Sequence, residues 1–135
     1  MSNGNYVVTS SSCDSATAIE VGAVTWGNGT TGITGTVTAS NSLVGTTSND
    51  HIGDLGVTVL SNGNYVVRSP YWSNVATATS VGAVTWGNGT TGSSGAINAA
   101  NSLVGTTSNR RHRCRWRHCA VERELRRHQP ILGSC

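Results

Sequence analysis

The fold is decided by the stretch VGAVTWGNGTTGITGTVTASNSLVGTTSN, which spans residues 21–49 and recurs almost unchanged at residues 81–109. The two copies are identical at 23 of 29 positions, at an offset of 60 residues. A second stretch, SNGNYVV at residues 2–8, recurs without change at residues 61–67. Self-similarity at a fixed period of this size is the signature of a repeat architecture.

The repeats divide the chain of 135 residues into three parts. Repeat 1 covers residues 2–49, repeat 2 covers residues 50–109, and residues 110–135 form a tail with no likeness to either repeat. Compared with repeat 2, repeat 1 lacks the counterpart of the first predicted strand. Repeat arrays generally need about three units to bury their faces, so we expect the pair to be marginally stable or to self-associate.

Local signals within one repeat predict short antiparallel strands. Residues 57–60 and 65–67 are β-branched and aromatic runs, and the Asn62-Gly63 pair between them accepts the positive φ angles of a hairpin turn. A third strand is predicted at residues 83–86, and residues 95–98 begin a fourth. No segment of the unit has the apolar spacing of a helix.

The predicted fold class is therefore all-β, in tandem antiparallel four-strand repeats of about 60 residues, with short β structure also favoured near Leu103-Val104. This is the size and content of a β-propeller blade, and two incomplete blades do not close a ring. The alternative is a β-solenoid, in which one unit would comprise several coils. The hairpin signal favours antiparallel pairing.

A family resemblance rests on five segments of repeat 2. They read DHIG at 50–53, VTVL at 57–60, NGNYVV at 62–67, SPYW at 69–72 and GAVTW at 82–86. Together they resemble an FG-GAP-type propeller blade and, more closely, repeats of large bacterial surface proteins of the filamentous-haemagglutinin-like or autotransporter adhesin kind. The resemblance implies a secreted or surface-displayed parent protein. Blades of that type often bind calcium through aspartates in the first turn, but residues 61–64 carry no carboxylate here, so calcium binding is not carried over.

Charge divides the chain sharply at the end of repeat 2. Residues 1–109 hold four acidic side chains and one basic one, a net charge of −3, whereas the tail holds eight arginines and two glutamates, a net charge of +6. One permitted codon choice for residues 109–135, read from the second nucleotide, encodes a hairpin and a Ser-Pro-Tyr-Trp segment at the spacing of repeat 2. We interpret the tail as a third repeat translated out of frame, and we expect it to be disordered.

The tail also contains soft metal ligands, namely His112, Cys114, His118, Cys119 and His128. Their spacing does not match paired cysteines followed by paired histidines, so zinc is disfavoured. The arginines would attract phosphates by charge alone, which does not amount to specific nucleic-acid recognition. No cofactor or metal is predicted.

Four aromatic residues of repeat 2 form the candidate binding surface: Tyr65, Tyr71, Trp72 and Trp86. Flat ring faces would suit a carbohydrate, but recurrence at equivalent positions in the repeats favours packing between units. Asp50 and His51 are adjacent, yet as consecutive strand residues they would point to opposite faces, and no nucleophile accompanies them. The sequence therefore carries no catalytic constellation.

The functional hypothesis is a non-enzymatic structural or adhesive repeat segment of a bacterial surface or secreted protein, present here as a gene fragment. Two alternatives remain, a glycan- or protein-binding pair of blades and a fragment of a propeller hydrolase. Expected partners are other repeats of the array, a second copy of the chain, surface glycans or host proteins. The sequence has no visible signal peptide and no apolar run long enough to insert in a membrane.

Overall fold

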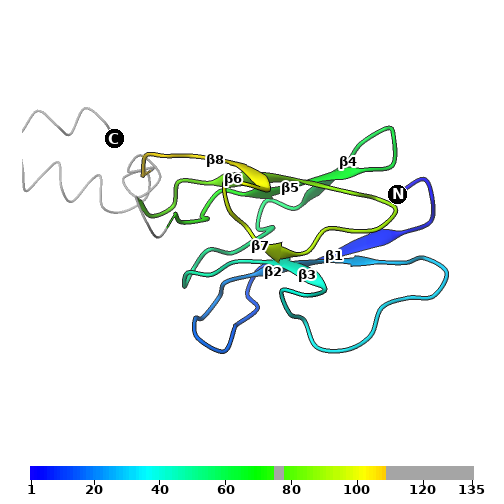
Figure 1. Ribbon diagram of the computed structural model, residues 1–135, viewed down its shortest axis with the longest axis horizontal. Helices are drawn as coiled ribbons and strands as arrows, with labels where there is room; N and C mark the ends of the chain where they lie inside the picture. Colours follow the sequence, from blue (N-terminus) through cyan, green and yellow to red (C-terminus); the bar gives the residue numbers. More distant parts are fainter. Residues whose placement is uncertain (75–77, 109–135) are drawn as a thin grey trace, which may run out of the picture.

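The computed structural model describes residues 1–74 and 78–108, which form two four-stranded sheets and no helix. Figure 1 shows the two sheets lying one over the other. In chain order the strands are β1 (Tyr6–Ser10), β2 (Ala23–Gly27), β3 (Ser42–Val44), β4 (Val57–Val59), β5 (Tyr65–Ser69), β6 (Ala83–Gly87), β7 (Gly95–Ala96) and β8 (Ser102–Val104). The predicted all-β class and tandem organisation are confirmed. Neither sheet closes on itself, and the described residues include no helix capable of crossing a membrane.

The two repeats have the same strand pairing. In the first sheet β1 pairs with β2 and β2 with β3, and in the second sheet β5 pairs with β6 and β6 with β8. The register is also the same, since Tyr6 lies opposite Gly27 and Tyr65 lies opposite Gly87. A Cβ atom at Gly87 would lie 2.1 Å from the ring of Tyr65, so each tyrosine ring needs the glycine across from it.

The predicted hairpin of repeat 2 is confirmed. Strands β4 and β5 are antiparallel, and Gly63 in the turn has φ 88°. The backbone N–H of Leu60 donates to the carbonyl of Asn64, and that of Gly63 donates to the carbonyl of Leu60. Glycine takes this left-handed conformation without steric cost, which explains Gly63 at the turn, whereas Asn62 does not take the positive φ predicted for it.

One strand prediction was wrong. Residues 95–98 do not begin the fourth strand of their own unit, because β7 leaves repeat 2 and pairs in parallel with β3 of repeat 1. Leu43 lies opposite Gly95, and the N–H of Ile97 donates to the carbonyl of Val44 at 3.2 Å. The fourth strand of repeat 2 is β8. Strand propensity identifies an extended segment but does not determine which sheet it joins.

The core lies between the two sheets. Burial alternates along β5 and β6, so that Tyr65, Val67 and Ala83 point toward repeat 1. From the first sheet, Val24 and Leu43 meet them. Because successive strand residues point to opposite faces, the other face of the second sheet points away from repeat 1. The core is therefore an interface between two consecutive repeats.

Candidate functional site

Equivalent valine and leucine residues of the two repeats differ greatly in their exposed fraction. Val24 and Leu43 of repeat 1 are 0% and 1% exposed, because repeat 2 covers them. Their counterparts in repeat 2, Val84 and Leu103, are 43% and 79% exposed. Both pairs sit in the same register, Val24 opposite Leu43 and Val84 opposite Leu103. Repeat 2 therefore presents outward the surface that repeat 1 uses to hold its neighbour.

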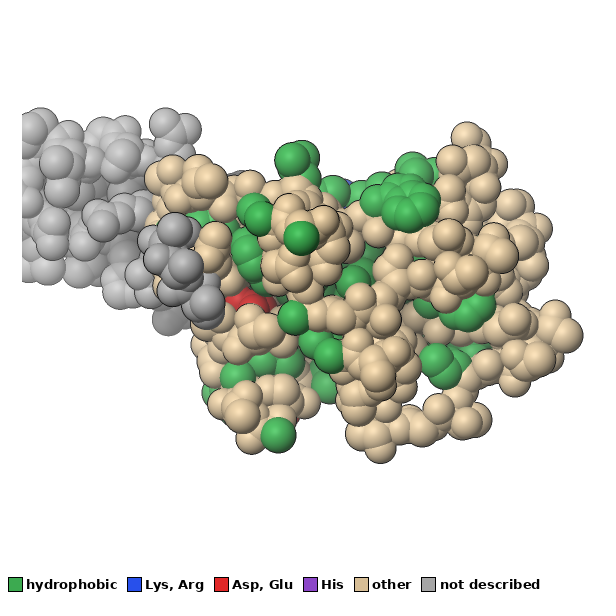
Figure 2. Space-filling model, in the orientation of Figure 1, with side chains coloured by type: hydrophobic (Ala, Val, Ile, Leu, Met, Phe, Trp, Pro, Cys, Tyr) green, Lys and Arg blue, Asp and Glu red, His purple; other side chains and the backbone are tan. Residues whose placement is uncertain are grey.

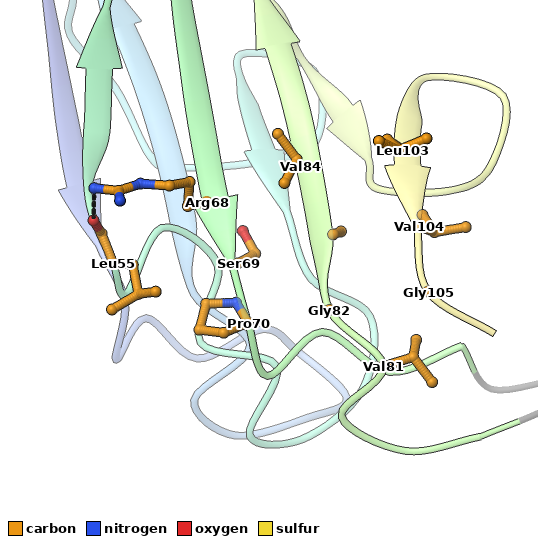
Figure 3. Close-up of a pocket in the computed structure, with 11 residues that line it drawn as sticks. Leu55, Arg68, Ser69, Pro70, Val81, Gly82, Val84, Leu103, Val104 and Gly105 are labelled. Carbon is orange, nitrogen blue, oxygen red and sulfur yellow. Dashed lines mark hydrogen bonds between the residues drawn. The ribbon is translucent and has the colours of Figure 1, made fainter. Parts of the chain in front are cut away.

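This outward surface is the outer face of repeat 2, which we define by Val66, Val84, Trp86 and Leu103. An open groove of about 470 Å³ runs over Val84 and Leu103, with Arg68 at its edge, and a second of about 440 Å³ is lined by Val66 and Trp86. Figure 2 shows hydrophobic side chains reaching the surface along the second sheet. In Figure 3, Val84 on β6 and Leu103 on β8 lie on neighbouring strands, while Arg68 turns aside and donates to the carbonyl of Leu55.

Polar contacts fix the buried interface between the repeats. The indole N–H of Trp26 donates to the carbonyl of Gly89 at 3.1 Å, and the side-chain amides of Asn3 and Asn5 donate to the same carbonyl at 2.8 Å. A Cβ atom at Gly92 would lie 2.8 Å from the Cβ atom of Trp26. The Gly-rich turn after β6 thus packs directly on the first sheet, and a larger side chain at Gly92 would separate them.

Asp50 joins the two repeats through a buried carboxylate. One oxygen, Oδ2, accepts hydrogen bonds from the backbone N–H groups of Thr46 and Thr47 in repeat 1, at 3.0 and 2.9 Å. The other oxygen, Oδ1, accepts one from the N–H of Ser73 in repeat 2, at 2.9 Å. Burial raises the pKa of this carboxyl above its ordinary 3.8, and the backbone hydrogen bonds oppose that shift only in part.

His51 does not form a catalytic pair with Asp50. The expectation that they are consecutive strand residues was wrong, because both lie in the loop that begins repeat 2 and His51 has φ 46°. The ring of His51 lies edge-on to Tyr71, with centroids 5.9 Å apart, and its Nε2 atom is 3.9 Å from a carboxylate oxygen of Glu20. Its Nδ1 atom lies 3.2 Å from the carbonyl of Ser11. These contacts hold loops of the two repeats together.

The structure does not bring the four predicted aromatic residues onto one surface. Tyr65 and Trp72 belong to the core and are 0% and 4% exposed, so neither offers a ring face to a ligand. Burial raises the pKa of the Tyr65 phenol above its ordinary value. Tyr71 is half-buried, and Trp86 is 52% exposed on the outer face. Sequence reasoning missed Val84 and Leu103, which complete that face.

No group of three or more His, Cys, Asp or Glu side chains able to hold a metal occurs within residues 1–74 and 78–108. The zinc candidates His112, Cys114, His118, Cys119 and His128 lie outside the described residues. The interpretation of the tail as an out-of-frame repeat, and the expectation that it is disordered, also concern residues outside the described part of the chain.

These observations define a tandem β-repeat protein whose consecutive units stack face to face. A family model for a repeat of unknown function (DUF5650) matches residues 1–54 and again residues 59–113, and the chain belongs to that family. No curated protein and no solved structure matches the chain.

Proposed function

We propose that the chain is a non-enzymatic structural repeat segment of an exported bacterial surface protein, in which stacked repeats form an adhesive array. The observation that carries this proposal is the reuse of one surface, buried at Val24 and Leu43 and exposed at Val84 and Leu103. A unit that covers its neighbour with one face and repeats the neighbour's surface on the other is suited to building an array.

Backbone pairing between the repeats supports a structural role. Strand β7 extends the sheet of the preceding repeat, and Gly22 forms a further parallel bridge with Ile52. The Ile52 N–H donates to the carbonyl of Val21 at 3.1 Å. These contacts are made by backbone atoms, and the Gly22 that permits one of them recurs as Gly82, so the geometry can recur along an array.

The surroundings of Asp50 support a non-enzymatic role. The carboxylate of Asp50 is fully buried and already accepts three backbone hydrogen bonds, which leaves no room for a substrate. Catalytic bases must instead reach the proton that they remove. A hydrolase screen of the full chain that gave turnover abolished by one substitution would contradict this part of the proposal.

The adhesive role and the cell surface come from the resemblance to bacterial adhesin repeats, with FG-GAP-like propeller blades as the proposed relatives. The exposed ring of Trp86 on the outer face adds support, because aromatic faces suit glycans and protein hot spots. Antibodies raised against the chain should label intact cells of the source organism, and surface proteolysis should remove the label. Labelling that appears only after lysis would contradict surface display.

Adhesion itself is tested with beads that carry the full chain. The beads should be retained on cultured host cells or on immobilised glycans more strongly than beads that carry heat-unfolded chain. Equal retention of the two bead types would contradict the adhesive role. The structural role of the stacked repeats would then be tested by the unfolding experiments alone.

A further inference from the structure

We propose that the outer face of repeat 2 binds a second copy of this chain, through the face of repeat 1 that points away from repeat 2, so that chains assemble head to tail. This inference rests on the proposed stacking role and extends it from neighbours within one chain to neighbours in different chains. The buried interface between repeats 1 and 2 is the template for the contact.

The first half of the contact is the outer face. Val66, Val84, Trp86 and Leu103 occupy the positions that Val7, Val24, Trp26 and Leu43 occupy in repeat 1. All four residue types are unchanged, so the apolar surface is the same. Inside the chain this surface is covered by repeat 2, and on repeat 2 it is open.

The second half is the opposite face of repeat 1. Tyr6 and Val8 are 39% and 46% exposed there, whereas their counterparts Tyr65 and Val67 are fully buried against repeat 1. A second chain therefore carries, on its own repeat 1, the tyrosine and valine that repeat 2 uses to cover its neighbour.

Backbone groups match across the same contact. Residues 35–36 are the counterpart of β7, but they form no strand in repeat 1. Among the described residues, β8 pairs only with β6. Against its other edge in another chain, residues 35–36 can repeat the β7–β3 pairing, with the N–H of Val37 donating to the carbonyl of Val104 as Ile97 donates to Val44. Val37 is 37% exposed, while Ile97 is 3% exposed.

The aromatic contact can also repeat. Trp26 packs on Gly92 and donates to the carbonyl of Gly89, so Trp86 would meet Gly32 and Gly29 of the second chain. Gly32 has the same left-handed backbone as Gly92, and the only atom near its missing Cβ is 4.0 Å away, so the site is open.

The two faces differ, so the contact is heterologous. Binding leaves the outer face of the second chain free to bind a third, which gives a ring if the rotation closes and a filament if it does not. On the outer face the clearest difference from the template is Arg68 in the place of Thr9. Its guanidinium is held against the carbonyl of Leu55 at 2.8 Å, at the rim of the groove. On the opposite face of repeat 1, Cys13 stands where repeat 2 has the core residue Trp72.

Sedimentation velocity of the full chain, at rising concentration, tests the proposal with three variants. Leu103→Asp puts a charge on the outer face, and Val8→Asp puts one on the opposite face of repeat 1. Ile19→Asp is the control, because Ile19 is 59% exposed and its counterpart Thr79 stays exposed where the internal stack has formed. Protection of the Ile97 N–H from hydrogen exchange verifies that each variant retains the internal stack.

The wild type and Ile19→Asp should grow beyond the dimer as concentration rises. Leu103→Asp and Val8→Asp should each associate at least about thirtyfold more weakly, the fold-change expected for losing one buried aliphatic side chain. Mixing these two variants should restore a one-to-one complex and nothing larger, because each keeps the face that the other has lost.

A wild type that stays monomeric while Ile97 is protected would overturn this inference and leave the proposed stacking role standing. A monomeric wild type in which the Ile97 N–H is not protected would overturn both the self-association inference and the proposed stacking role. Association that persists in both charged variants, or a mixture that forms no complex, would place self-association on another part of the chain and would also overturn the inference.

Discussion

Replacing Asp50 with alanine should destabilise the protein far more than its place in a connecting segment suggests. The substitution removes the acceptor of three backbone N–H groups, two in repeat 1 and one in repeat 2. A buried donor left without an acceptor costs about 1–3 kcal/mol, and relief from burying a charge offsets part of the sum. We expect a net loss of about 2–4 kcal/mol, a large share of the stability of a small domain.

Urea unfolding, followed by tryptophan fluorescence, measures this loss. The midpoint should fall with little change in slope, since the surface exposed on unfolding stays similar. Asp54→Ala is the matched control, because Asp54 is exposed and only four residues away, and it should change stability by about 0.5 kcal/mol or less. If Asp50→Ala costs no more than Asp54→Ala, the carboxylate does not join the repeats and the reasoning is refuted.

Four further predictions concern the stability of the folded chain. Because burial raises the pKa of Asp50 in the folded state, lowering the pH through that raised value toward 3.8 should stabilise the wild type relative to Asp50→Asn, and a relative loss of stability on acidification would contradict this. Leu43→Ala should cost about 2–5 kcal/mol in urea unfolding and Leu103→Ala about 0.5 kcal/mol or less, and equal costs would contradict the assigned interface. Gly87→Ala should lower the free energy of unfolding by about 1–3 kcal/mol, because its Cβ would lie 2.1 Å from the buried ring of Tyr65. Gly27→Ala should cost less, because the facing ring of Tyr6 is partly exposed and can move, and a lower melting temperature for Gly27→Ala than for Gly87→Ala would contradict the packing described. Neither calcium nor zinc should raise the melting temperature, and a saturable rise of several degrees with either ion would reveal a binding site.

Local sequence was sufficient to predict the strands and the turn. Gly63 of the Asn62-Gly63 pair takes the predicted left-handed backbone, although Asn62 does not, and the β-branched runs on either side form β4 and β5. The destination of β7 was not predictable in this way, because pairing between repeats depends on which unit lies beside the segment. Residues 35–36 and 95–96 have similar sequences, yet only the pair with a preceding repeat forms a strand.

The candidate site was harder to predict for the same reason. Leu43 and Leu103 lie in an identical Asn-Ser-Leu-Val-Gly segment, so no local signal distinguishes the buried residue from the exposed one. Their positions in the array decide their exposure. One signal was available for Tyr65, since a tyrosine paired across the strands with a glycine in both repeats indicates a ring packed over the sheet.

The most direct test of face-to-face stacking is hydrogen exchange at Ile97 and Val37, measured by NMR on the dilute full chain. Val37 and Ile97 are β-branched residues at equivalent positions, each two residues after a glycine. Only Ile97 has a preceding repeat in the chain, and the carbonyl of Val44 in that repeat accepts its N–H. Stacking predicts that Ile97 exchanges only through opening of the interface between repeats, whereas Val37 exchanges almost as fast as an unstructured peptide. Equal protection of the two amides, or faster exchange at Ile97, would contradict the stacked arrangement.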